Sequence, residues 1–207
     1  ALGAAAASDG GILTVPENGF TSVNLALTPG RGGACSTRST HPATFRQVNG
    51  VLSAAKIPVR VVNPHADETK GQMVRKAAKA PGFQSIAAET ISCSKLDGRT
   101  YLHGNPNAHC GLCVACIVRR AAFVAAGIQD ETDYLVDLLP ADSRALLVKR
   151  RRSDIDAVVK ATTVIPSIAQ IDSRLVAAAM WADETERRAA ARVYRRGLQE
   201  IAHVQLP

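Results

Sequence analysis

Four cysteines constrain the fold of this chain more than any other feature of its sequence. Cys110, Cys113 and Cys116 follow one another at C-x-x-C spacing in the run HCGLCVACIVRR, and Cys93 lies upstream. A C-x-x-C turn brings two sulfur atoms to one point, and zinc prefers four soft or borderline ligands at tetrahedral angles. The spacing therefore predicts that Cys93 folds back to complete a four-cysteine metal site.

The residues around the cysteines indicate what kind of site to expect. Cys116 is predicted at or just inside the start of a helix that ends near Gly127, where the helix N-terminus stabilises a thiolate. Four sulfurs leave no open coordination position, so we expect structural zinc, with an iron–sulfur cluster as the rival. Disulfides fit poorly, because the cysteine count of 5 is odd. Arg119 and Arg120 follow, and we expect one of them to face either a nucleotide phosphate or a surface carboxylate.

Composition places the chain among proteins that can bury a real core. Of its 207 residues 46% are hydrophobic, yet no apolar run reaches the roughly 18 residues of a membrane helix, so we expect no membrane partner. Cysteines used as metal ligands indicate a reducing compartment, the cytoplasm. The net charge of +7 favours an anionic partner such as a nucleotide. Nucleic acid fits less well, because bases are bound by stacking on aromatic residues, which make up only 4% of the chain.

Apolar spacing before the cysteines predicts alternating strands and helices. Residues 12–15 and 59–62 are expected to form short strands, and a helix is expected from Pro42 until Pro58 interrupts it. A further helix is predicted after Thr69, which can cap it. This alternation indicates an α/β fold with parallel strand pairing.

The last third of the chain has a different pattern and predicts a helical appendage. Two helical patterns, divided near Ser153, precede Pro166, and two more cover residues 168–182 and 184–204. In the last of these, an apolar face lies opposite a row of arginines. Such basic runs are typical of solvated helix faces.

Two groups of polar residues are candidates for ligand binding. Glu17 and Asn18 directly follow the first strand, at the edge where open α/β sheets bind ligands. They suit a ribose, a base edge or Mg²⁺. Arg38, Thr40 and His41 lie in a loop before a helix. Backbone N–H groups and a guanidinium there would form an anion cradle.

Each candidate also has a plainer structural explanation. The first group fits a simple turn, and the second fits an N-cap within a polar loop. Lys70 stands at the start of a predicted helix, where it would neutralise a phosphate or carry surface charge. Cys35 lies apart from the cluster and is expected to be a small loop residue, because nothing in the sequence fixes a base beside it.

The run SCSKLDGRTYLHGNPNAHCGLCVACIVRRAAFVAAGIQDE resembles the zinc-binding end of the QueC enzymes, the 7-cyano-7-deazaguanine synthases. The four cysteines match that family's zinc ligands one by one. Three upstream blocks are closer to the QueC-like proteins of bacterial antiphage systems: PENGFTSVNLALTP, STRSTHPATF and NPHADETKGQMVRKA. The resemblance covers roughly residues 1–135, and residues 136–207 would form a helical C-terminal extension.

The resemblance implies the C-terminal portion of a PP-loop, adenine nucleotide alpha hydrolase-like domain. It also implies adenylation of 7-carboxy-7-deazaguanine by ATP with Mg²⁺, followed by attack of ammonia. The nucleotide or deazapurine pocket implied by the resemblance consists of Glu17, Asn18, Arg38, Thr40, His41 and Lys70. The chain departs from the family in lacking a Ser-Gly-Gly-x-Asp-Ser phosphate loop, since Ser8-Asp9-Gly10-Gly11 shares its letters but not their order. A segment that carries this loop is therefore an expected partner.

Three functional hypotheses follow. The leading one is the zinc-bearing portion of a QueC-like ATP-dependent ligase, whose acceptor is ammonia, a protein amine or another amine. The second, from a different class, is a non-catalytic zinc-stabilised module that contacts nucleic acid or a partner protein. The third is a thiolation-type relative with an iron–sulfur cluster, which iron content and a brown colour would reveal.

Overall fold

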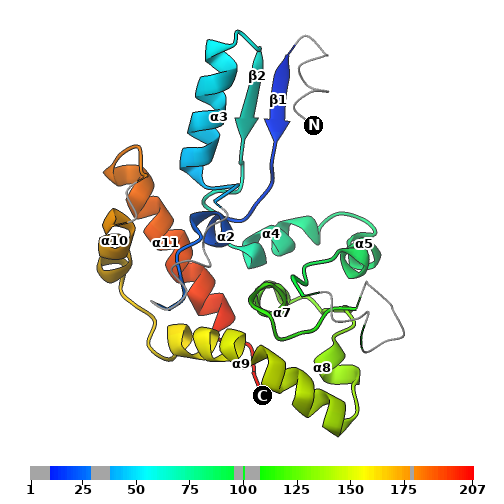
Figure 1. Ribbon diagram of the computed structural model, residues 1–207. Coiled ribbons are helices and arrows are strands. Elements are labelled where there is room, and N and C mark those ends of the chain that lie inside the picture. The colour runs from blue at the N-terminus through cyan, green and yellow to red at the C-terminus, as the bar shows by residue number, and fades with distance from the viewer. Residues whose placement is uncertain (1–9, 29–37, 96–99, 101–107, 178–179) are drawn as a thin grey trace. The chain divides into compact units, whose positions relative to one another are not determined.

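The computed structural model divides the chain into two compact units (Figure 1). One unit comprises Ala1–Thr69 with Pro166–Arg196, and the other Lys70–Ile165 with Gly197–Pro207. The residues that the structure describes are 10–28, 38–95, 100, 108–177 and 180–207. Cys35, Ser36 and Thr37 of the predicted loop lie outside these ranges.

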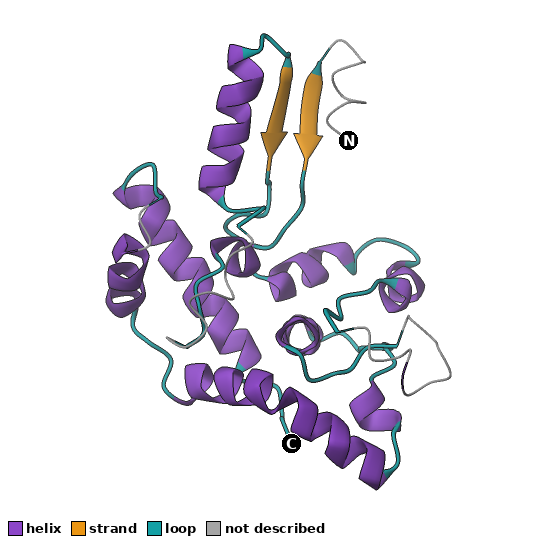
Figure 2. Cartoon of the chain, in the orientation of Figure 1, coloured by secondary structure: helices purple, strands orange, loops and turns teal. Residues whose placement is uncertain are grey.

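A parallel strand pair forms the centre of the first unit. Strand β1 (Gly11–Thr14) pairs with β2 (Val59–Val62), and α3 (Pro42–Ala54) packs against β2 (Figure 2). Both strands and the helix were predicted, and the α/β class is confirmed. Within the described residues the sheet has two strands. The buried residues between helix and sheet are Leu52, Val59 and Val61.

Three more helices belong wholly or partly to the first unit: α2 (Gly19–Val23), α10 (Ile168–Ala177) and α11 (Glu184–Ile201). Phe20 of α2 stacks on Tyr194 of α11, with ring centroids 5.0 Å apart. The apolar face predicted for α11 is buried, which confirms the helical spacing. Its members are Ala190, Val193, Tyr194, Leu198 and Ile201.

The second unit is helical. Its elements are α4 (Lys70–Ala77), α5 (Phe83–Glu89), α7 (Val114–Ala126), α8 (Leu135–Leu138) and α9 (Ala141–Thr163). Helix α4 begins directly after Thr69, as predicted, and packs along α7. None of the helices in the described ranges is long and apolar enough to cross a membrane.

Helix α9 corrects the sequence interpretation. Two helices divided near Ser153 were predicted, but one helix runs from Ala141 to Thr163. Its buried face continues through the predicted break, with Leu147 on one side and Ile155 on the other. The basic run of residues 149–152 between them contains no apolar residue. The sequence pattern therefore did not show that the buried face is continuous. The boundary of 1–135 against 136–207 stays a prediction.

Candidate functional site

The segments that leave the carboxyl ends of β1 and β2 are joined by Asn63. Its Nδ2 donates to the backbone oxygen of Glu17 at 2.7 Å, and its Oδ1 accepts from the N–H of His65 at 3.0 Å. The same Nδ2 lies 3.3 Å from Ser22 Oγ, which donates to Thr40 Oγ1 at 3.4 Å. Two predicted site residues, Glu17 and Thr40, therefore share one hydrogen-bond network at the edge of the sheet.

Asn18 supports this edge as a helix cap. It is buried, and its Oδ1 accepts from both the N–H and the hydroxyl of Thr21 at 3.0 Å. The N–H and Nδ2 of Asn18 donate to Glu17 Oε1 at 2.9 and 2.6 Å. The polar atoms of Asn18 thus hold the Glu17 carboxylate in place, which leaves Glu17 as the member of this pair suited to contact a ligand.

His41 caps α3. Its Nδ1 accepts from the N–H of Ala43 at 3.1 Å, and its ring centroid lies 4.8 Å from that of Trp181. Burial, together with the positive charge of Arg38, lowers the pKa of His41 to about 4. The imidazole is therefore neutral near pH 7 and does not act as a cation toward phosphate. A ligand contact by His41 stays a prediction.

The other two predicted residues are placed differently. The guanidinium of Arg38 donates to Met180 Sδ, and its backbone oxygen accepts from the Thr44 hydroxyl at 2.6 Å. Lys70 is the first residue of α4 and belongs to the second unit, so it is described apart from this network.

Sequence reasoning missed Asn63 and Ser22. Asn63 directly follows β2, and the carboxyl ends of parallel strands meet at one edge. That position was the available signal, and it is the same signal that singled out Glu17. Ser22 lies on the short helix α2, and nothing in the sequence marked it.

The second unit brings the four predicted ligand cysteines together. The Sγ atoms of Cys93, Cys110, Cys113 and Cys116 all lie within 4.8 Å of one another, and all four residues are buried. The Sγ atoms of Cys110 and Cys116 are 3.9 Å apart. Thiolates about 2.3 Å from a tetrahedral zinc ion are separated by about 3.8 Å. The cluster therefore fits a single tetrahedral metal ion.

Local backbone geometry builds the cluster. Gly111 has φ +81°, and a Cβ there would lie 2.6 Å from Val136 Cγ1, so the turn after Cys110 requires glycine. Cys113 is the N-cap of α7, and its N–H donates to Cys110 Sγ at 3.2 Å. Cys116 lies just inside the helix, as the sequence predicted.

Shared hydrogen bonds make the four thiols unequal. The Cys110 thiol lowers the pKa of Cys93 and lowers that of Cys113 to about 6. The hydrogen bond with Cys113 raises the pKa of Cys110. The hydrogen bond with Cys110 raises the pKa of Cys116. Four thiolates in one buried cluster therefore require a cation, and a divalent ion that binds there must displace the shared protons.

Arg119 ties the segment that carries Cys93 to α7. Its side chain is only 3% exposed. Its Nη1 donates to the hydroxyls of Thr90 at 2.8 Å and Ser92 at 3.4 Å, and its Nη2 donates to the Ala87 carbonyl at 2.5 Å. Through these bonds, a side chain of α7 holds the residues before Cys93 in position, and the same helix carries Cys116 and is capped by Cys113.

His109, directly before Cys110, also contacts the segment before Cys93. Its Nε2 lies 3.1 Å from the backbone oxygen of Thr90, and its Nδ1 lies 4.0 Å from Cys116 Sγ. Burial, followed by the charge of Arg119, lowers the pKa of His109, so the ring is neutral and Nε2–H is the donor. Thr90 is thus held through both its carbonyl and its hydroxyl.

Of the two alternatives predicted for the arginine pair, the surface ion pair is found. Arg120 Nη2 lies 3.3 Å from Asp137 Oδ2, and its guanidinium stands 4.7 Å from the centre of the Tyr134 ring. Arg119 takes neither predicted role, because its guanidinium is turned into the protein.

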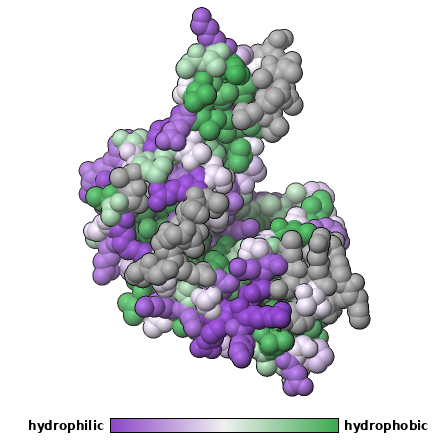
Figure 3. All heavy atoms as spheres, viewed as in Figure 1, coloured by the Kyte–Doolittle hydropathy of each residue, from purple (hydrophilic) through white to green (hydrophobic). Residues whose placement is uncertain are grey.

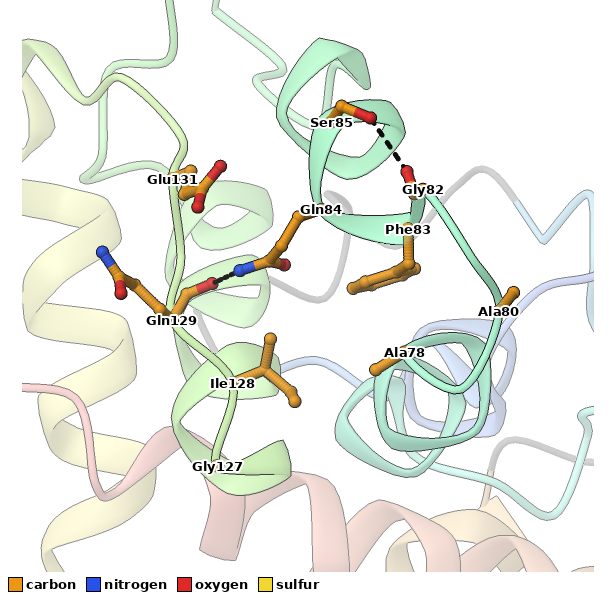
Figure 4. Close-up of a pocket in the computed structure, with 10 residues that line it drawn as sticks. All are labelled: Ala78, Ala80, Gly82, Phe83, Gln84, Ser85, Gly127, Ile128, Gln129 and Glu131. Carbon is orange, nitrogen blue, oxygen red and sulfur yellow. Dashed lines mark hydrogen bonds between the residues drawn. The ribbon is translucent and has the colours of Figure 1, made fainter.

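A cavity of about 610 Å³ opens beside α5 and the end of α7. Figure 4 shows Phe83 and Ile128 turned towards it, and Gln84 reaching across to donate to the Gln129 carbonyl at 3.0 Å. Glu131 is the one ionisable side chain among the lining residues that the structure describes. With a single carboxylate and no lysine or arginine among these residues, this cavity does not fit a phosphate.

Comparison with protein families gives one match within this chain. The model described as queuosine biosynthesis protein QueC matches residues 39–127. That segment contains all four clustered cysteines and the loop from Thr40 onward.

Two curated relatives each match slightly less than half of the chain. The 7-cyano-7-deazaguanine synthase of Rhizobium etli is 43% identical over 90 residues, covering 44% of this chain and 33% of that protein. The synthase of Methanothrix thermoacetophila is 37% identical over 107 residues, covering 49% of this chain and 42% of that protein. The chain therefore spans between 33% and 42% of the length of these relatives. No solved structure matches the chain significantly.

The neutral His41 predicts acid-sensitive stability. Its pKa is about 4 in the folded protein and 6.5 ordinarily, so between these values the unfolded chain binds a proton that the folded one does not. The stabilisation is complete above pH 6.5 and is lost as the pH falls through 4, by up to about 3 kcal/mol. His41→Asn retains a capping side chain without the titration. Urea unfolding across this range should show a shallower pH slope for the variant, and an equal slope would contradict the assignment.

The tethering by Arg119 predicts an effect on metal affinity. Arg119→Gln should weaken zinc binding about 10- to 100-fold, because it releases the segment before Cys93. Arg152→Gln is the control, since Arg152 forms an exposed pair with Asp156 on α9. Competition with chelators of graded affinity measures the difference, and circular dichroism checks that both variants fold. Equal affinities in the two variants would remove the positioning role.

Proposed function

Because this chain is QueC-like over residues 39–127, we propose that it is the zinc-bearing portion of an ATP-dependent carbon–nitrogen ligase. In the proposed reaction, a carboxylate oxygen of a 7-carboxy-7-deazaguanine-type acid attacks the α-phosphorus of ATP and pyrophosphate leaves. Ammonia or another amine then attacks the acyl carbon, and AMP leaves. Catalysis of this kind depends mainly on positioning and on charge stabilisation.

The observation that carries the proposal is the buried four-cysteine cluster inside the QueC-like segment. Zinc bound there would be structural, since four protein sulfurs complete its coordination. It would supply the positive charge that keeps the thiolates together and fixes the Cys93 segment against α7. The bond-making steps belong to other residues.

The edge of the strand pair supports the nucleotide part of the proposal. Glu17, held by Asn18, presents a carboxylate suited to Mg²⁺ or to a ribose hydroxyl. Arg38 is the proposed phosphate contact of the first unit, and Lys70 is a separate proposed contact in the second unit. The chain contains no Ser-Gly-Gly-x-Asp-Ser loop, so the proposed activity needs a segment that supplies one. The proposal includes a cytoplasmic role in antiphage defence, which rests on the resemblance alone.

Metal content tests the first half of the proposal. The purified chain should hold one zinc ion, and Cys93→Ser and Cys113→Ser should each lose most of it, because three sulfurs leave the site incomplete. Cys35→Ser is the matched control and should keep the zinc. Elemental analysis by mass spectrometry gives the stoichiometry. Iron in place of zinc would favour the iron–sulfur alternative, and no metal at all would overturn the proposal.

Pyrophosphate release tests the second half. The complete product of the gene, given ATP, Mg²⁺ and 7-carboxy-7-deazaguanine, should release pyrophosphate only when the acid is present. The 207-residue chain by itself should release none, because it lacks the phosphate loop. A coupled pyrophosphate assay distinguishes the two. Release by the chain alone would contradict the loop argument, and no release by the complete product would contradict the ligase assignment.

A non-catalytic binding module is the second candidate, and basic residues of α9 favour it. Lys149, Arg150 and Arg152 are exposed, and hydrophilic residues gather over this helix in Figure 3. Nucleic-acid affinity that falls steeply with salt, in a complete gene product without ligase activity, would select this alternative.

A further inference from the structure

The first unit contains a cavity of about 430 Å³. Its walls include Ser22, Asp67, Trp181 and, on the segment leading into α11 and its first turn, Asp183 and Glu186. The last three lie beyond the QueC-like segment, residues 39–127. A cavity of this volume accommodates one heteroaromatic base or nucleoside.

Trp181 forms a fixed aromatic wall of this cavity. Its ring lies against His41, and its Nε1 donates to the backbone oxygen of Leu175 at 2.9 Å. The indole is half-buried and is held through both its ring and its N–H group. A flat ring stacked on a fixed aromatic side chain is stabilised without a requirement for one particular base.

The polar atoms of the cavity are mainly acceptors. Asp67 and Asp183 are exposed carboxylates, and one oxygen of Asp183, Oδ1, accepts from the N–H of Glu186 at 2.8 Å. Glu186 is already engaged by the guanidinium of Arg46 and the N–H of Ala182. No lysine or arginine stands among the described lining residues. This arrangement attracts ligands that donate hydrogen bonds and repels phosphate.

Ser22 connects the cavity to the edge of the strand pair. It lines the cavity and also bonds to Asn63 and Thr40. Ligands of open α/β sheets bind outside the carboxyl ends of the strands. The cavity therefore adjoins the place where a ligand of this fold is expected.

We propose that this cavity binds a flat, amino-bearing heteroaromatic base, stacked on Trp181 with its N–H groups towards Asp67 and Asp183. The residues after the QueC-like segment thereby complete a binding site. The deazapurine acid and the adenine ring of ATP share this chemistry, and the choice between them rests on the proposed function.

The single tryptophan of the chain allows a direct test. Titration with 7-carboxy-7-deazaguanine or guanosine should change the Trp181 fluorescence, and inorganic pyrophosphate should not. Adenosine is the third arm, and a stronger response to it would support the site and assign it to the adenine ring. Calorimetry gives the same affinities without the optical signal.

Matched variants separate the site from non-specific stacking. Asp67→Asn should weaken binding of the preferred base about tenfold or more, because it removes a charged acceptor. Asp142→Asn, in the first turn of α9, should leave the affinity unchanged. Binding by Asp67→Asn equal to that of the unmodified chain, an equal response to pyrophosphate, or no binding at millimolar base would overturn the proposal.

Failure of this site and failure of the ligase function give different results. Base binding at Trp181 without pyrophosphate release by the complete gene product supports the site and contradicts the ligase. Pyrophosphate release without base binding at Trp181 supports the ligase function and contradicts the site.

Discussion

Mutual repulsion among four buried sulfurs is the constraint on which the second unit depends. The sulfurs lie within 4.8 Å of one another, and thiolates at that separation in a buried place are unfavourable unless a cation offsets them. The chain converges on this cluster from two directions, the segment before Cys93 and the loop into α7. Everything that fixes these two segments, from the turn at Gly111 to the cap at Cys113, serves to hold the sulfurs where one ion can meet all of them.

The first unit depends on helix capping and on the hydrogen bonds of side-chain amides. Asn18 and His41 each begin a helix, and Asn63 bridges the segments that follow the two strands. Most side-chain donors and acceptors of these three residues are bonded to other groups of the protein. Among the described residues, the groups proposed to meet a ligand are the carboxylates of Glu17, Asp67 and Asp183 and the ring of Trp181.

Local spacing could be read from the sequence, whereas bonds between distant segments could not. The C-x-x-C steps and the apolar face of α11 repeat at fixed intervals, so they predicted the cluster and the buried side of that helix. Arg119 resembled a surface cation next to Arg120, because its partners come from a segment about thirty residues away. Asn63 was equally inconspicuous until the parallel pairing brought its strand beside β1.

A loaded cluster would carry surplus charge as well as a fixed geometry. Zinc held by four thiolates carries two surplus negative charges, and buried surplus charge makes sulfur a good nucleophile toward oxidants. The charge of Arg119 is felt by His109, beside Cys110, and the start of α7 adds a positive dipole. That dipole would offset part of the surplus charge, and the burial of all four cysteines would limit the access of peroxide, so that the packing that fixes the geometry would also provide chemical durability.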